Sequence, residues 1–129
     1  MTVYVHKRFD KSFKKIGLTE RILHDIAEQV IRGEFEANLG SGVIKKRVSL
    51  HEGKRGGART IIFFMFGHHL FFYDGWVKSR LSDKSTKEIE DDELESYKRL
   101  AKALLKADKD QLNSLCKSGF LREVKNDEN

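Results

Sequence analysis

Five of the Lys and Arg residues between Gly42 and Arg80 are of a type and at positions that suit contact with phosphate groups. Lys45 and Arg47 are two residues apart in a run of strand-forming residues, so their side chains project from one face, roughly 7 Å apart. Groups spaced in this way can hold neighbouring phosphates of RNA, and a guanidinium group binds two phosphate oxygens at once. Arg59, Lys78 and Arg80 can join the same patch, so Lys45, Arg47, Arg59, Lys78 and Arg80 are the candidate catalytic residues if this surface cuts RNA as well as holding it.

Cleavage of RNA without a metal needs three kinds of group. A base must take the proton of the 2′-hydroxyl group, cations must stabilise the phosphorane, and an acid must protonate the leaving 5′-oxygen. We assign Lys45 as the candidate base, because crowding by other cations favours its neutral form. Arg47 and Arg59 would stabilise the developing charge, and Lys78 or Arg80 would be the acid or a further phosphate contact.

A second group of residues surrounds these cations and could contact the bound RNA. The connection from His51 to Arg59 is basic and rich in glycine, and its amides near Gly56 and Gly57 could approach a phosphate closely. It lacks the GxxxxGK[ST] pattern of a nucleotide-binding loop. The predicted substrate-binding residues are Lys46, His51, Lys54, Arg55, Tyr73 and Trp76. The alternative is that the cations form only a solvated sheet face.

Positive charge is concentrated in this part of the chain. The protein has 25 Lys and Arg against 20 Asp and Glu, a formal net charge of +5. The stretch from Gly42 to Thr60 contains six cations and one acid, so this stretch alone equals the excess of the whole chain. Such a local excess indicates an anionic partner that binds at one place.

No metal and no cofactor are predicted. His68 and His69 are adjacent, so their side chains point to opposite sides, and no neighbouring Cys, Asp or Glu completes a ligand set. His6 and His24 are expected at the surface. The single Cys116 excludes an internal disulfide and indicates a reducing compartment.

The composition predicts one domain over residues 1–129, with 39% hydrophobic and 35% charged residues. No apolar run is long enough for a signal peptide or a membrane span, so we expect a cytoplasmic protein with no membrane partner. Residues 83–129 are predicted to form a C-terminal helical extension that ends in a frayed tail over 125–129.

The hydrophobic periodicity predicts an α+β fold. Its first half should contain a short strand at Thr2–His6, a helix at Lys7–Lys15, a helix between Thr19 and Gly33, and a loop at Glu34–Ser41. A three-stranded antiparallel meander should follow at Val43–Leu50, Arg59–Phe66 and Leu70–Lys78. Helices at Asp91–Lys106 and from Asp108 to Lys117, and an extended segment at Phe120–Val124, should complete the chain.

This order of elements, together with three local motifs, resembles the RelE/ParE superfamily of bacterial toxins. The motifs are LGSGVIKKRV, GGARTIIFF and FFYDGWVKSR, and the last two together are typical of the RelE-type and HigB-type toxins. The similarity extends from about Phe9 to about Phe120. Some relatives use histidine and acidic residues near the end of the third strand, where this chain has Tyr73 and Asp74.

The resemblance implies a metal-independent endoribonuclease that cleaves mRNA on the ribosome and thereby inhibits translation. It also implies neutralisation by a cognate antitoxin with a helix-turn-helix domain. The toxin would then associate with operator DNA only through this antitoxin. Three alternatives remain open. The chain could inhibit gyrase as ParE-like toxins do, bind nucleic acid without cutting it, or use its basic face only to hold an acidic antitoxin segment.

Overall fold

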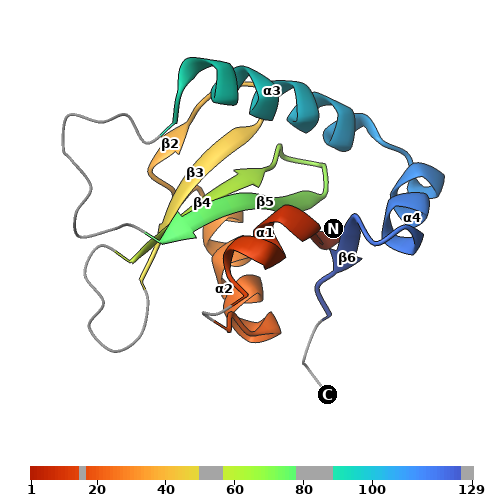
Figure 1. Ribbon diagram of the computed structural model, residues 1–129, viewed down its shortest axis with the longest axis horizontal. Helices are drawn as coiled ribbons and strands as arrows, with labels where there is room; N and C mark the ends of the chain where they lie inside the picture. Colours follow the sequence, from red (N-terminus) through yellow and green to blue (C-terminus); the bar gives the residue numbers. More distant parts are fainter. Residues whose placement is uncertain (15–16, 50–56, 78–88, 126–129) are drawn as a thin grey trace.

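A six-stranded sheet with helices on both faces forms the protein (Figure 1). The structure, a computed structural model, describes residues 1–14, 17–49, 57–77 and 89–125. The strands are β1 (Val3–His6), β2 (Ala37–Asn38), β3 (Val43–Val48), β4 (Ala58–Phe63), β5 (Leu70–Val77) and β6 (Leu121–Glu123). The helices are α1 (Lys7–Ser12), α2 (Glu20–Ile31), α3 (Asp91–Lys106) and α4 (Lys109–Lys117). This arrangement confirms the predicted α+β class.

The sheet is larger than the predicted meander. Its strand order is β2-β3-β4-β5-β1-β6, with β1 parallel to β5 and the other neighbours antiparallel. Strands β3, β4 and β5 form the predicted meander, and the strand predicted at Thr2–His6 pairs with β5 as β1. The sheet is larger because β6 adds beside β1 and β2 adds beside β3. The loop expected at Glu34–Ser41 was wrong in part, since Ala37 and Asn38 pair with β3. Isolated strands this short carry little sequence signal.

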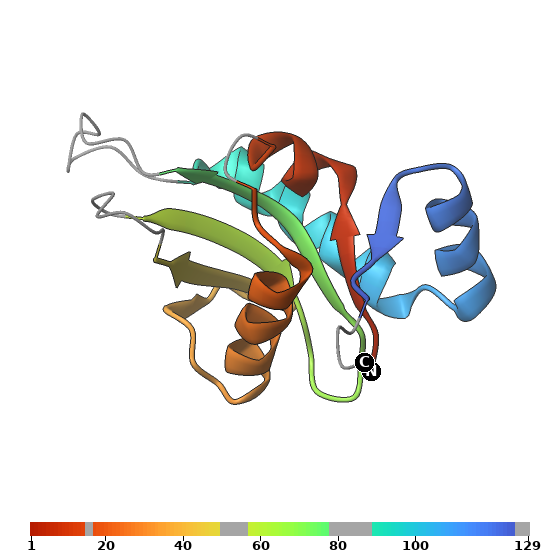
Figure 2. The same cartoon turned by 90° about the horizontal axis from the view of Figure 1, so that it is seen from below.

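Two apolar clusters lie on opposite faces of the sheet. On one face α1 and α2 cover residues that include Ile44, Ile62 and Phe72. On the other face α3 and α4 cover Val43, Ile61 and related residues. The three central strands therefore carry apolar side chains on both faces, as the apolar run in β4 predicts. Figure 2 shows α1 alongside β5, in the space that the short strand β1 leaves open.

Local signals set the helix boundaries. The Thr19 hydroxyl group accepts a hydrogen bond from the N–H of Ile22 at the start of α2. Gly33 follows that helix with φ +85, a backbone conformation that glycine adopts without steric cost. Asp108 and Gln111 form a capping box at the start of α4. These residues explain the positions of α2 and α4, and the predicted position of α3 is also confirmed.

Candidate nucleic-acid interface

Strand pairing brings three of the predicted cations to one face of the sheet. Arg47 of β3 lies opposite Arg59 of β4, and Lys45 lies opposite Ile61. Directly paired residues project from the same face, and Ile61 belongs to the cluster beneath α3. Lys45, Arg47 and Arg59 therefore share the α3 face, and we call these three residues the strand cluster.

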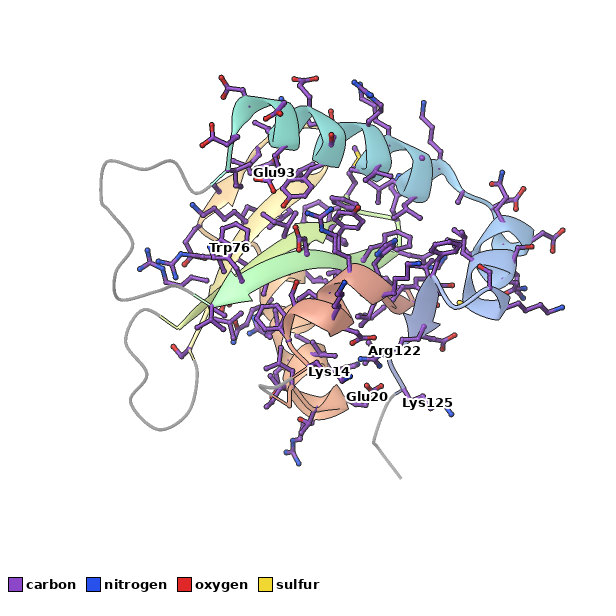
Figure 3. The ribbon with its side chains drawn as sticks, in the orientation of Figure 1. Lys14, Glu20, Trp76, Glu93, Arg122 and Lys125 are labelled. Atoms are coloured by element: carbon purple, nitrogen blue, oxygen red, sulfur yellow. The ribbon has the colours of Figure 1, made fainter. Side chains whose placement is uncertain are left out.

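Trp76 extends the strand cluster onto a third strand. It pairs with Arg59 across β4 and β5, so Arg47, Arg59 and Trp76 form one row across the sheet. Opposite residues in adjacent strands have Cβ atoms about 5 Å apart, so the row is about 10 Å long. The Trp76 ring is half-buried against the apolar cluster under α3. Figure 3 shows it on β5 at the end of the sheet far from α4.

The three cations differ in their contact with solvent. Arg47 is exposed and Lys45 is intermediate, whereas Arg59 is 2% exposed. The backbone N–H of Arg47 donates to the Glu36 carboxylate at 2.6 Å, which holds this part of β3 beyond the end of β2. Of the three cations, Arg47 is therefore the most accessible to an incoming anion, whereas Arg59 is buried.

Two of the predicted substrate-binding residues have other surroundings. Lys46 projects from the α2 face, between Ile44 and Val48 in sequence, and is 8% exposed. It lies near Glu34, whose pKa is lowered first by Arg32 and also by Lys46. Lys46 therefore does not join the strand cluster.

Tyr73 is 5% exposed and lies in the apolar cluster under α3. Its ring stacks on Phe63 at 4.8 Å between ring centroids and meets Tyr97 edge-on at 5.8 Å. In this conformation the ring packs in the core and does not face a bound base.

The remaining predicted site residues, Lys78, Arg80, His51, Lys54 and Arg55, lie outside the described residues. Their proposed roles stay predictions. Gly57, the described residue nearest to this basic connection, has φ +54, and a Cβ atom there would clash with the carbonyl oxygen of Val48. The end of the connection therefore passes close to β3.

Sequence reasoning missed a polar network behind Trp76. Asp74 is 6% exposed, and its carboxylate accepts a hydrogen bond from the Tyr97 hydroxyl group at 2.5 Å. It also pairs with Arg8 at 3.1 Å and accepts from the N–H of Gly75 at 2.8 Å. Burial, and then the bond to Asp74, raise the pKa of Tyr97 above its ordinary value. The signal available in the sequence was an aspartate inside an apolar strand, which needs partners when buried.

His6 also differs from its expected surface position. Its Nδ1 atom accepts from the N–H of Arg8 at 3.1 Å and caps α1, and its ring lies 4.7 Å from Tyr73. Burial, followed by the charges of Lys7 and Arg8, lowers the pKa of His6 below its ordinary 6.5. A neutral imidazole suits the cap, since a protonated ring has no acceptor.

A model of the family described as the RelE toxin of the RelE/RelB toxin-antitoxin system matches residues 1–124. The chain belongs to this family. A search of curated proteins finds no match.

As a RelE-family toxin, the protein is expected to have an antitoxin partner. The match includes all six strands and all four helices, so the strand cluster and the Asp74 network both lie within the family's domain. Among the residues that the structure describes, no helix is long and apolar enough to cross a membrane. Within the same residues, no three His, Cys, Asp or Glu side chains gather to hold a metal ion.

Proposed function

We propose that this RelE-family toxin is an endoribonuclease that cleaves mRNA on the ribosome without a metal and so inhibits translation. The observation that supports this function best is the row formed by Arg47, Arg59 and Trp76, with Lys45 beside it on the same face. Three cations and an aromatic ring on one sheet face can hold a ribose-phosphate link and an adjacent base.

The proposed reaction is an internal transesterification. Lys45 takes the proton from the 2′-hydroxyl group, and the 2′-oxygen attacks the neighbouring phosphorus atom. The bond to the 5′-oxygen breaks, a cyclic phosphate forms, and an acid supplies the proton that the 5′-oxygen needs. Arg47 and Arg59 stabilise the phosphorane charge, and Lys78 or Arg80 is the proposed acid or a further phosphate contact.

Arg47 is the sharpest test of this function, because its exposed side chain can be removed without opening the core. We expect Arg47→Ala to lower the rate of ribosome-dependent mRNA cleavage by about 100-fold, in the range seen when one charge-stabilising donor is lost. The control is Lys102→Ala, an exposed cation of α3. Equal cleavage by wild type and Arg47→Ala, in folded protein, would remove the strand cluster from the reaction.

Arg59→Ala and Arg80→Ala extend the test to the buried cation and to the residue beyond β5. Because Arg59 is 2% exposed, each variant is first compared with wild type in urea unfolding. Intact transcripts together with a DNA-damage response after induction would instead indicate gyrase inhibition. A third outcome would indicate a non-catalytic RNA-binding protein. In that case neither wild type nor the variants cut RNA, and the variants only bind RNA more weakly, with a smaller dependence of affinity on salt.

The proposed antitoxin carries a helix-turn-helix domain and covers the strand cluster when it neutralises the toxin. The charge of Arg47 and Lys45 suits an acidic antitoxin segment as well as it suits RNA, so one surface can serve both partners in turn. Co-expression with the product of the adjacent gene, followed by co-purification, tests this partner. Loss of the complex on Arg47→Glu, with retention on Lys102→Glu, is the expected result.

A further inference from the structure

A second set of cations lies on α1 and on the residues that follow it, outside the strand cluster. The first fourteen residues contain four cations and a single acid, Asp10. The side chains of Lys7, Lys11 and Lys14 are exposed. Lys7 and Lys11 are one turn apart on the helix, so their side chains are neighbours.

The nearby acids Asp10 and Glu20 form their hydrogen bonds with Arg122 and with the backbone of Lys125, not with these lysines. Both oxygens of Asp10 accept from the Arg122 guanidinium, at 2.7 and 2.9 Å. Glu20 accepts from the same guanidinium at 2.6 Å and from the N–H of Lys125 at 2.9 Å. Figure 3 shows Arg122 and Glu20 side by side, with Lys125 beside Glu20.

Lys7, Lys11 and Lys14 form no ion pair with any carboxylate in the described part of the chain. This contrasts with Arg8 on the same helix, which pairs with Asp74. The charge of the three lysines is therefore available to a partner. We call these residues, together with Phe120, the α1 surface.

Phe120 adds an aromatic ring to the α1 surface. It is 41% exposed, and the Lys7 ammonium group lies 4.1 Å from the ring centroid. The carbonyl oxygen of Phe120 accepts from the N–H of Lys7 at 2.9 Å, which fixes the ring beside α1. Exposed aromatic rings among cations are typical of proteins that bind single-stranded RNA, where bases stack on the ring and cations contact phosphates.

The α1 surface begins next to the strand cluster. Helix α1 lies along β5 (Figure 2), and Arg8 bonds to Asp74, two residues before Trp76. A strand of RNA that leaves the row of Arg47, Arg59 and Trp76 across β5 would therefore reach α1 directly.

We propose that the α1 surface is a second RNA-binding site, in which phosphates contact Lys7, Lys11 and Lys14 and one base stacks on Phe120. The inference rests on the proposed function only in taking the strand cluster as the place of cutting. RNA fits this surface better than an acidic protein segment does, because a nucleobase uses the exposed ring as well as the charges.

The experiment measures the binding of a fluorescein-labelled single-stranded RNA of about 20 nucleotides, by anisotropy, between about 50 and 200 mM KCl. Each phosphate contact contributes about 0.7 to the slope of log affinity against log salt for a single strand, so the triple variant Lys7→Ala/Lys11→Ala/Lys14→Ala should lose about two from the slope. The control, Lys102→Ala/Lys106→Ala/Lys109→Ala, removes the same charge from exposed positions on α3 and α4. Equal slopes for the two triple variants would overturn the proposal.

A second comparison tests the aromatic ring. Phe120→Leu should weaken RNA binding at least about fivefold, the lower end of the contribution of one stacked base, with the salt slope kept. Phe66→Leu is the control, because Phe66 is an exposed aromatic residue at 79% exposure, outside the α1 surface. Equal affinity of Phe120→Leu and wild type would exclude the base contact.

The two proposals fail in different measurements. Suppose that Arg47→Ala cleaves RNA at the wild-type rate while the α1 triple variant shows a smaller slope of log affinity against log salt. The strand cluster is then not the cutting site, but the α1 surface still binds RNA. If Arg47→Ala loses cleavage while the triple variant binds RNA as wild type does, the α1 surface is excluded alone. Weakened binding of a polyglutamate peptide, with RNA binding unchanged, would assign the α1 surface to an acidic protein and overturn the proposal.

Discussion

Tyr97→Phe is a direct test of the polar network that joins α3 to β5. The substitution removes one hydroxyl group from a side chain that is 1% exposed and leaves its ring in place. Asp74 then loses a partner at 2.5 Å but keeps Arg8 at 3.1 Å and the N–H of Gly75 at 2.8 Å. A hydrogen bond to a charged group contributes about 1.5–3 kcal/mol, so we expect the free energy of unfolding to fall by about 2 kcal/mol.

Urea unfolding followed by circular dichroism measures this change. For a protein of this size the dependence on urea is about 1–3 kcal/mol per molar, so the midpoint should fall by about 1 M. Tyr73→Phe is the matched control, since Tyr73 belongs to the same apolar cluster and its hydroxyl group makes no hydrogen bond within the part of the chain that the structure describes. Its midpoint should change by less than about a quarter of that amount.

A midpoint for Tyr97→Phe equal to that of Tyr73→Phe would refute the reasoning, because it would mean that the Asp74 carboxylate needs no third partner. The same variants also separate stability from function. The Tyr97 hydroxyl group donates its hydrogen bond to Asp74, and within the described residues it forms none with Arg59 or Trp76. The rate of mRNA cleavage by Tyr97→Phe, measured under conditions in which the variant is folded, should therefore stay close to that of wild type.

Three further predictions concern stability. Because the pKa of His6 is lowered in the folded protein, the stabilisation that neutral His6 provides is complete above the unfolded pKa of 6.5 and is lost as the pH falls below that value. The variant His6→Asn keeps a side-chain acceptor for the cap but does not titrate. Its unfolding free energy should therefore fall less than that of wild type between pH about 7.5 and about 5.5. Parallel pH dependences would contradict this assignment. Arg122→Ala should lower the unfolding free energy, measured in urea, by about 1–3 kcal/mol, because the two carboxylates lose their shared partner. Arg122→Lys should lower it by a smaller amount, since the positive charge is kept. An unchanged midpoint for Arg122→Ala would show that water replaces these contacts. Gly75→Ala should lower the melting temperature, because its Cβ atom would collide with the Phe13 ring and lie 2.7 Å from the carbonyl oxygen of Arg59; a melting temperature equal to wild type would show that this ring moves aside freely.

The helices and the central strands were predictable because their signals are local. A capping hydroxyl group at Thr19, the apolar stripe of α2 and the glycine after it determine that helix within fifteen residues of sequence. The alternation in β3 likewise separates Lys45 and Arg47 from Lys46 before any fold is known. The short strand β2 was harder to predict, since it is held mainly by its neighbour β3, whereas the extended segment predicted at Phe120–Val124 is present as β6.

Part of the candidate site followed from composition and spacing, and part did not. The sequence identifies a cation-rich segment, and the alternation assigns a face to each cation. That Arg59 lies opposite Arg47 depends on the register of β3 against β4. That Trp76 lies opposite Arg59 depends on the register of β4 against β5, which shifts between Ile61 and Ile62. The burial of Tyr73 depends on α3, because Tyr97 covers its ring.

What the sequence alone determined is the class of fold, the positions of its helices and the concentration of positive charge in one segment. Only the tertiary structure decided which charges are neutralised. Asp10 and Arg122 are 112 residues apart in the chain, and Asp74 and Tyr97 are 23 apart, yet each pair forms a hydrogen bond. The physical reason is that periodicity reports which face of an element a side chain occupies, whereas the partner of a charge depends on how distant elements pack.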